Sequence, residues 1–485
     1  MRLQPRRSFI VATAVALSLA PAVTGAQDNS AKTEKAAAPA KPGKGAIRIV
    51  TLDPGHFHAA LPHRESYPGV DTRVHVYAPL GNDLIKHLGR ILQFNTRAEA
   101  PTAWALDVHT GPDYLDRFKR EKAGNVVVIS GRNRGKIDYI QTGVGAGYHV
   151  LADKPWILRS EDLPKLKATL DLAEKKGRVA FDMMTERFEI TTLLQKELVN
   201  DPEVFGKVDP GTPDKPSVYM ESVHHLMKVV AGAPNIRPAW FFDKDQQGEG
   251  MNDIGTHLVD LVPWTLWPGQ GMTEKEIQIL SAQRWPTMIS KANFQRVTGE
   301  KDFPEFLKKD LKGDELEYFC NSLVTYTVRG VHTKLNIIWD WEAPAGTGDT
   351  HFAYYRGTRA RIEVRQGKAE KFRPETYVVP SDPKDKPAIL AAVKKRLAGL
   401  QGRFAGVDVD EVGNDLRLRI PDKLRTTHEE HFAEVARAFF GYLANPKSFP
   451  KWEKPHMLTK YYVTTKGTEL SRQGPVKVAE RVAPK

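Results

Sequence analysis

The stretch Ile47-Arg48-Ile49-Val50-Thr51-Leu52-Asp53-Pro54-Gly55 is a mostly apolar, strand-forming run that stops at a turn. Similar runs at residues 72–77, 125–130, 148–152 and 178–183 alternate with helical patterns at 135–146 and 163–176. The continuous β-branched run Val126-Val127-Val128-Ile129 is typical of a strand that is buried on both faces. Strands that alternate with helices predict a parallel, doubly wound sheet, and therefore a Rossmann-like α/β domain over residues 46–185.

The second half of the chain has a different pattern. Strand-like segments at residues 217–223, 323–329, 333–339 and 359–364 follow one another with few helices between them. This order predicts an α+β domain with a largely antiparallel open sheet over residues 186–470, closed by helices at 426–443 and 458–468. Residues 380–405 are charged and weakly patterned, so we expect a surface arm there, and residues 471–485 form a tail.

Length, charge and cysteine content limit the classes of protein to consider. A chain of 485 residues exceeds one ordinary hydrophobic core, which favours two domains. The net charge of +12 is spread along the chain, with no basic block interleaved with aromatic residues, so we expect no nucleic-acid partner. The single cysteine, Cys320, excludes an intramolecular disulfide and a multi-cysteine zinc site.

The N-terminus has the pattern of an export signal. Residues 1–26 combine early arginines, a short apolar run and a small-residue cleavage site, and an Ala/Lys/Pro-rich linker follows at 27–45. Arg6-Arg7-Ser8-Phe9-Ile10 is similar to the twin-arginine signal, whose pathway carries folded proteins; an ordinary secretory signal is the alternative. We therefore expect a periplasmic or extracellular protein without a membrane span after the signal is removed.

The turn after the first strand carries only part of a dinucleotide-binding fingerprint. That fingerprint needs glycine at three spaced positions, where the pyrophosphate approaches the backbone amides and the start of a helix. Here the three positions hold Asp53, Gly55 and His58, and no acidic residue ends the second strand. The alternative is a nucleotide-type fold that has lost its nucleotide.

Two further motifs carry polar side chains suited to proton transfer. Lys154, in Ala152-Asp153-Lys154-Pro155-Trp156, follows a strand, and ligands bind at the carboxyl ends of strands in open parallel sheets. A lysine there can hold a substrate hydroxyl and shuttle its proton, although it could also be a surface lysine before a turn. Asp253, His257 and Asp260 lie on one stripe of a predicted helix, where His257 could relay a proton or could be a core histidine.

A metal site is a weaker alternative. His224 and His225 end a predicted strand, and Glu221, Asp253 and His257 could add carboxylate and imidazole ligands. Their spacing is not diagnostic, and adjacent strand residues are expected to point to opposite faces. We expect no metal.

Three stretches together resemble the Gfo/Idh/MocA oxidoreductase family. They are Val150-Leu151-Ala152-Asp153-Lys154-Pro155, the Asp253/Gly255/His257/Asp260 pattern, and the stretch from Phe181 to Glu186-Arg187-Phe188. The second half and the turn at residues 51–58 are similar to its subgroup with a "putative oxidoreductase C-terminal" domain. The resemblance implies that Lys154 is the catalytic lysine, His257 the acid/base and Asp253 the site aspartate. Departures are Asp153 for the usual glutamate, the missing glycines at 53 and 58, and Gly131-Arg132-Asn133 for a Thr-Pro-Asn turn.

The resemblance also implies a tightly bound NAD or NADP. The cofactor-binding positions expected from it are Asp53, Gly55, His56, Phe57, His58, Gly131, Asn133, Asp153, Lys154 and Pro155. The substrate-binding positions expected from it are Arg187, His224, His225 and Asp260.

The sequence thus predicts an exported oxidoreductase that acts on a secondary alcohol of a sugar or cyclitol. One alternative is an NAD-dependent glycosidase or lyase that oxidises its substrate transiently, with no net redox change. Another is a non-catalytic sugar- or nucleotide-binding protein. An open sheet face makes a homo-oligomer plausible.

Overall fold

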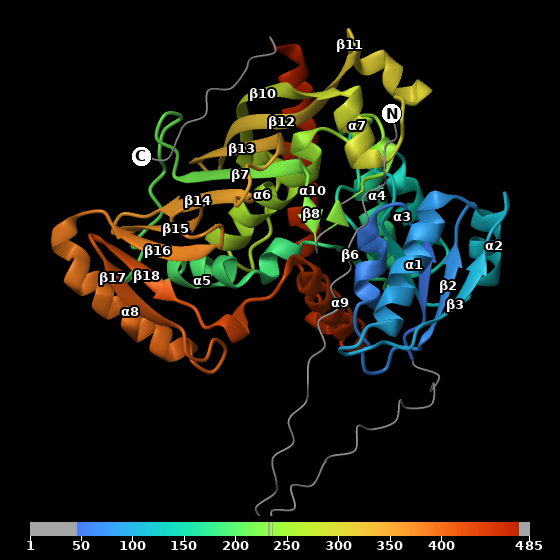
Figure 1. Ribbon diagram of the computed structural model, residues 1–485. Helices are drawn as coiled ribbons and strands as arrows, with labels where there is room; N and C mark the ends of the chain where they lie inside the picture. Colours follow the sequence, from blue (N-terminus) through green and yellow to red (C-terminus); the bar gives the residue numbers. More distant parts are fainter. Residues whose placement is uncertain (1–45, 231–232, 235, 475–485) are drawn as a thin grey trace, which may run out of the picture. The chain divides into compact units, whose positions relative to one another are not determined.

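The computed structural model describes residues 46–230, 233–234 and 236–474 (Figure 1). The predicted signal peptide at 1–26 and the linker at 27–45 lie outside the described residues, as does the end of the tail from residue 475. Among the helices that are described, none is long and apolar enough to cross a membrane.

The first sheet has six parallel strands in the order β3-β2-β1-β4-β5-β6. These strands are β1 (Ile49–Leu52), β2 (Arg73–Tyr77), β3 (Ala105–His109), β4 (Val126–Ile129), β5 (His149–Ala152) and β6 (Ala180–Asp182). The order reverses between β1 and β4, as in a doubly wound fold, which confirms the predicted fold class. The sequence pattern does not reveal β3, because this edge strand is largely exposed and carries no apolar run.

The helices of the first sheet are α1 (Asn82–Thr96), α2 (Tyr114–Glu121), α3 (Lys136–Gly145) and α4 (Leu163–Lys175). After β1, however, the chain forms only a short 3-10 segment, η1 (Phe57–His63), which contains Pro62. The space is filled from the far end of the sequence, because Phe432 and Phe439 of α9 (His428–Ala444) join the core that lies on this face of the sheet. The sequence placed α9 in the second domain, whereas its packing links it to the first sheet.

The second sheet is mostly antiparallel, with one parallel pair between β13 and β7. Its main path runs β10-β12-β13-β7-β14-β15-β16-β18-β17, and β11 pairs with β12. The strands are β7 (Val218–Met227), β10 (Ile277–Ser290), β11 (Leu311–Lys312), β12 (Glu315–Val328), β13 (Val331–Glu342), β14 (Thr350–Arg356), β15 (Ala360–Gln366), β16 (Glu375–Pro380), β17 (Asp408–Val412) and β18 (Asp415–Arg419).

The expectation of a surface arm at residues 380–405 is wrong. Most of this stretch is a helix, α8 (Lys386–Leu400), which packs on the second sheet near β17. Ile389, Val393 and Leu397 recur at four-residue spacing and are buried in the main core, so one helix face is apolar although the segment as a whole is charged.

Four more helices complete the described chain. They are α5 (Ile190–Val199), α6 (Gly250–Leu266), α7 (Lys291–Thr298) and α10 (Glu453–Gln473). α6 and α10 pack against each other, and Met457 and Tyr461 of α10 reach the core on the second face of the first sheet. Because α10 also contacts β10, the same helix touches both sheets.

A buried histidine at the end of η1 predicts sensitivity to acid. His63 is fully buried with neither ring nitrogen hydrogen-bonded, and burial lowers its pKa to about 4. The unfolded chain binds a proton at this ring near pH 6.5, but the folded chain does so only near pH 4, so the free energy of unfolding falls as the pH drops through this window. We expect His63→Phe to lose less stability than the parent between pH 7 and pH 5, by on the order of 1–2 kcal/mol.

The measurement is urea unfolding of both proteins at the two pH values. Comparing each protein with itself removes the packing cost of the larger ring. Equal losses in parent and variant would contradict the assignment of a neutral, buried imidazole.

Candidate functional site

An ion pair between Lys154 and Asp253 joins the end of β5 to the first turn of α6. The Lys154 Nζ lies 2.5 Å from Asp253 Oδ1 and also donates to the Asp253 carbonyl oxygen at 3.0 Å. The exposed fractions of the two side chains are 6% and 13%. Burial alone would raise the pKa of Asp253, but the charge and the hydrogen bond of Lys154, together with His56 and His257, hold that pKa below its usual value. The Asp253 carboxylate is therefore ionised near pH 7, and it fixes the lysine at the carboxyl end of its strand.

His257 lies one helical turn beyond Asp253, on the same side of α6. Its ring is buried and Nδ1 has no hydrogen-bond partner among the described residues. Burial, followed by the charge of Lys154, lowers its pKa to about 3. The imidazole is neutral near pH 7 and is free to accept a proton.

These three residues line a cavity with a volume of about 430 Å³, which is larger than the cavity next to it. Such a volume suits a small ligand. Its wall also includes polar side chains that lie in or next to η3 (Thr185–Phe188), β7, β14 and α9: Glu186, Ser222, His224, Lys228, Asp349, His351 and His428. Of these, only His224 was expected from the sequence.

Glu186 and His428 form a pair that the sequence did not reveal. Their Oε1 and Nδ1 atoms lie 3.6 Å apart, and 44% of the His428 side chain is exposed. Burial would raise the pKa of Glu186, but its hydrogen bond to His428 and the charge of the nearby His257 bring the pKa below its usual value. The pair places a carboxylate and a partly exposed imidazole in the same cavity as His257.

A second set of acid and base groups surrounds Asp349. Its carboxylate lies 3.3 Å from His224 Nδ1 and 2.9 Å from His225 Nδ1, and it also accepts a hydrogen bond from Lys228. Adjacent histidines were expected to point to opposite faces of the strand, but both rings contact this one carboxylate. His224 lines the larger cavity, whereas the buried His225 supports Asp349 from behind the lining.

Asp153 is held by the turn that follows β1. Its Oδ2 accepts from His58 Nδ1 at 2.9 Å and from Ser130 Oγ at 3.0 Å, and His56 Nδ1 lies 3.5 Å away. Within the part of the chain that the structure describes, His56, His58 and Asp153 are also three potential metal ligands whose atoms all lie within 4.8 Å of one another. They differ from the histidines and carboxylates that the sequence had suggested as metal ligands.

The β1 turn differs from a glycine-rich cofactor cradle. Asp53 has φ of 45°, the left-handed conformation for which the first glycine is normally used. The backbone amides of Gly55 and His56 both donate to the Ser130 carbonyl oxygen at 3.1 Å. Gly131 lies so close to this turn that a Cβ atom there would stand 2.4 Å from the Asp53 carbonyl oxygen. The β1 and β4 turns therefore bind to each other, and these two amides are not available to a pyrophosphate.

Two other expected cofactor positions have protein partners. His58, at the third glycine position, packs against Phe432 of α9 with ring centroids 4.4 Å apart. Asn133 donates to the Gln247 carbonyl oxygen at 2.7 Å. Pro155 follows Lys154 through a cis peptide bond. Of the expected cofactor residues, those that line a cavity are Gly55, His56, Phe57, His58 and Lys154.

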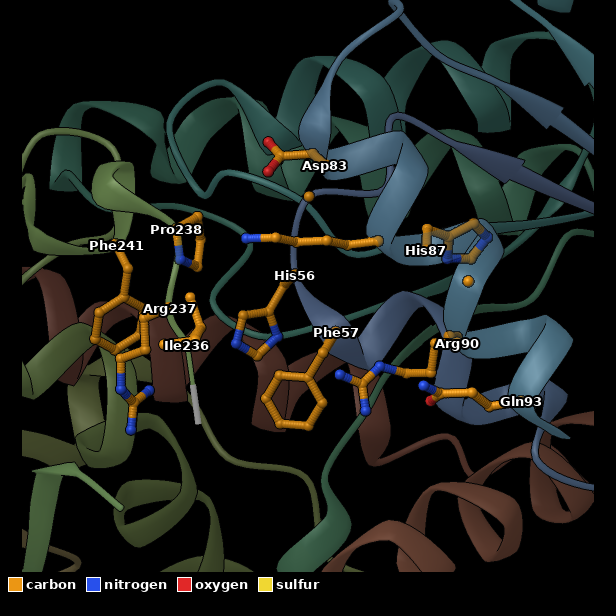
Figure 2. A pocket seen from close by; sticks show the side chains of 14 residues that line it. His56, Phe57, Asp83, His87, Arg90, Gln93, Ile236, Arg237, Pro238 and Phe241 are labelled. Carbon is orange, nitrogen blue, oxygen red and sulfur yellow. The ribbon is translucent and has the colours of Figure 1, made fainter. Parts of the chain in front are cut away.

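The smaller cavity, of about 300 Å³, lies between the β1 turn, α1 and residues 236–241 (Figure 2). Lys86 and Arg90 of α1 and Arg237 line it, together with the carboxylate of Asp83. Four residues line both cavities: His56, Phe57, Arg237 and Phe241. The two cavities therefore adjoin each other around the side chains that follow β1.

Arg187 and Asp260, expected to contact substrate, line neither cavity. They form a buried two-pronged ion pair with both N···O distances at 2.6 Å. Arg187 also pairs with Glu453 of α10 at 2.9 Å, and Lys460 of α10 bridges Asp260 at 3.1 Å and Asp182 at 3.0 Å. These contacts assign Arg187 and Asp260 to the connection between β6, α6 and α10.

We expect Asp260→Ala to destabilise the fold by about 3–5 kcal/mol, because it leaves the buried Arg187 and Lys460 charges without a shared partner. The measurement is equilibrium denaturation, with Asp116→Ala, which removes an exposed carboxylate of α2, as the control. A loss below about 1 kcal/mol would contradict the structural assignment of Asp260.

The comparisons with known proteins agree with this arrangement. The model of the family described as "Putative oxidoreductase C terminal domain" matches residues 194–472, more than half of the chain. The chain belongs to this oxidoreductase family. A structure of a putative oxidoreductase from Parabacteroides merdae is 43% identical, with a TM-score of 0.86, over 89% of this chain and 98% of that one. No curated protein sequence matches the chain.

More distant structures share the fold. A putative myo-inositol dehydrogenase from Sinorhizobium meliloti is 13% identical, with a TM-score of 0.51 over 88% of this chain and 98% of that one. The 3-ketoreductase KijD10 from Actinomadura kijaniata, in complex with NADP and TDP-benzene, is 15% identical, with a TM-score of 0.53 over 88% and 97%. The predicted membership of the family with a putative oxidoreductase C-terminal domain is confirmed, and the distant structures agree with the predicted fold.

Proposed function

We propose that this oxidoreductase interconverts a secondary alcohol and a ketone on a sugar or cyclitol, with NAD or NADP as its tightly bound cofactor. The observation that carries the proposal is the larger cavity, in which the Lys154–Asp253 ion pair and the neutral His257 lie together. The related folds of the 3-ketoreductase KijD10, bound to TDP-benzene, and of the putative myo-inositol dehydrogenase support the substrate class.

In the proposed reaction, the Lys154 ammonium donates a hydrogen bond to the substrate oxygen and stabilises negative charge on it. His257 accepts the hydroxyl proton as the alcohol becomes a ketone. Asp253 is a positioning residue, since it holds the Lys154 Nζ at 2.5 Å. A nicotinamide cofactor, when bound, supplies the acceptor for the hydride.

The low pKa of His257 has a consequence for proton release. An imidazole with a pKa of about 3 does not retain a proton near pH 7. Glu186 carries a negative charge that favours protonated His257, and it pairs with the partly exposed His428. We infer that the proton leaves His257 toward solvent past Glu186 and His428.

A redox-neutral cleavage is a second candidate, and the Asp349 cluster favours it. Simple oxidation needs one proton relay, yet His224 and Lys228 add further acid/base groups to the same cavity. Such groups would serve the elimination of a bond next to a transiently formed ketone. Release of a leaving group without accumulation of reduced cofactor would distinguish this reaction from net oxidation.

The test of the proposed site compares turnover and stability in two variants. Lys154→Met and His257→Gln should each lower kcat by about 10²–10⁴-fold, because each removes a group that acts on the reacting oxygen or its proton. Turnover is followed by reduced nicotinamide absorbance with a panel of sugars and cyclitols, and melting is measured on the same samples.

Ser281→Ala, on the second sheet and outside both cavities, is a matched control that should keep full activity. If His257→Gln melts lower but turns over at the parent's rate per folded molecule, His257 is a packing residue and the proposed chemistry is wrong.

We also propose that the protein is exported with its cofactor already bound, through the twin-arginine pathway. The support is the Arg6-Arg7-Ser8-Phe9-Ile10 motif, together with a cofactor site that forms only in the folded chain. Replacing Arg6 and Arg7 with lysine should abolish export of a folded fluorescent reporter fused to residues 1–45. Replacing Lys32 and Lys35 of the linker with arginine is the control. Unchanged export of the double-lysine signal would contradict this route.

A further inference from the structure

The smaller cavity carries cationic side chains without carboxylate partners. Among the described residues, no carboxylate lies within ion-pair distance of Lys86, Arg90 or Arg237, and the one acid in the lining, Asp83, is paired with Arg132 at 3.2 Å. Asp83 also accepts a hydrogen bond from Trp240 at 3.2 Å. The lining of the cavity therefore carries three cationic side chains and one carboxylate, and that carboxylate is paired with a residue outside the lining.

Aromatic rings hold two of these cations in place. The Arg90 guanidinium lies 5.3 Å from the centre of the Phe57 ring, and that of Arg237 lies 4.6 Å from the Phe241 ring and 5.2 Å from Trp339. Figure 2 shows Phe57 beside Arg90, with Arg237 next to Phe241 on the other wall. Burial lowers the pKa of both guanidiniums, because the loss of water outweighs the nearby Glu429 for Arg90 and the more distant Asp253 and Asp349 for Arg237. Such half-buried cations bind an anion well.

His87 adds a buried polar group to the same wall. Only 5% of it is exposed, and neither of its ring nitrogens has a hydrogen-bond partner among the described residues. Unpartnered polar atoms at this depth are rare in folded proteins and are expected where a ligand completes the site.

We propose that the smaller cavity binds a phosphate group of the dinucleotide cofactor through Lys86 and Arg90, with Arg237 at the junction of the two cavities. This inference rests on the proposed function and assigns the anionic end of the same ligand. The β1 turn cannot supply its usual contacts there, because the amides of Gly55 and His56 bind Ser130. Side-chain cations thus replace the backbone amides of a glycine-rich turn.

The geometry connects this anion site to the proposed chemistry. His56, Phe57, Arg237 and Phe241 line both cavities, so a ligand that passes between them reaches from the cations of α1 to Lys154 and His257. An extended dinucleotide carries its charge and its reactive ring at different places in the same way. Its diphosphate lies in the middle, NADP has a further phosphate at the adenosine end, and the nicotinamide lies at the opposite end.

The experiment is fluorescence titration of the purified full-length protein, stripped of nucleotide, with NADH and with NADPH. We expect Lys86→Ala/Arg90→Ala to bind at least one of them about tenfold or more weakly, because a charged hydrogen bond to phosphate is lost. Weaker binding of both dinucleotides assigns the cations to the diphosphate, and weaker binding of NADPH alone assigns them to the 2′-phosphate. Either result supports the inference.

Lys119→Ala/Arg120→Ala, on the exposed surface of α2, removes the same charge and should leave both affinities unchanged. Lys86→Gln, at an exposed position, gives a second readout should the double variant melt lower than its parent. If the parent binds a dinucleotide and the α1 variants bind it equally well, the inference is wrong and the proposed function stands. If the parent binds neither dinucleotide at millimolar concentration, the proposed function fails and the inference fails with it.

Discussion

The buried network around Arg187 is the interaction on which the arrangement of the site depends. Arg187 follows β6, Asp260 belongs to α6, and Glu453 and Lys460 belong to α10. Buried charges are costly unless each has a partner in good geometry, so these elements have few alternative ways to pack. The network therefore fixes α6 relative to the first sheet. Because Asp253 and His257 lie on that helix, it also fixes their distance from Lys154 at the end of β5.

The chain combines a doubly wound strand order with a β1 turn that lacks the glycine-rich cradle. The turn after β1 donates hydrogen bonds to the Ser130 carbonyl oxygen and packs closely against Gly131, so it is joined to the turn after β4. The positive charge that a cofactor needs then comes from the side of α1. Selectivity among anionic ligands is set by long side chains rather than by backbone amides, and single substitutions at such side chains can alter it.

The sequence predicted the parts of the fold that depend on local pattern. The β-branched run at 126–129 and the helix that places Asp253 and His257 one turn apart were both identified, and so was Lys154 after a strand. What it could not predict depends on contacts between distant segments. Nothing in the sequence near Arg187 and Asp260 shows that they pair with each other and with α10. The partner of Arg187 on α10 lies 266 positions along the chain, and the partner of Asp260 lies 200 positions along it. Lys86 and Arg90 resemble any charged helix residues until the cavity beside them is seen. The helix at 386–400 was missed because its apolar stripe is narrow.

The replacement of a helix after β1 by α9 affects how the chain is made. A ribosome delivers β1 through β6 first, but part of one face of that sheet stays uncovered until residues 428–444 emerge, and Lys460 follows still later. His428 enters the site on the same late helix. The N-terminal half therefore completes its core, and the cavity its lining, only after most of the chain has been synthesised. Truncation near the C-terminus would damage the packing of the first-synthesised sheet as much as that of the last-synthesised helices.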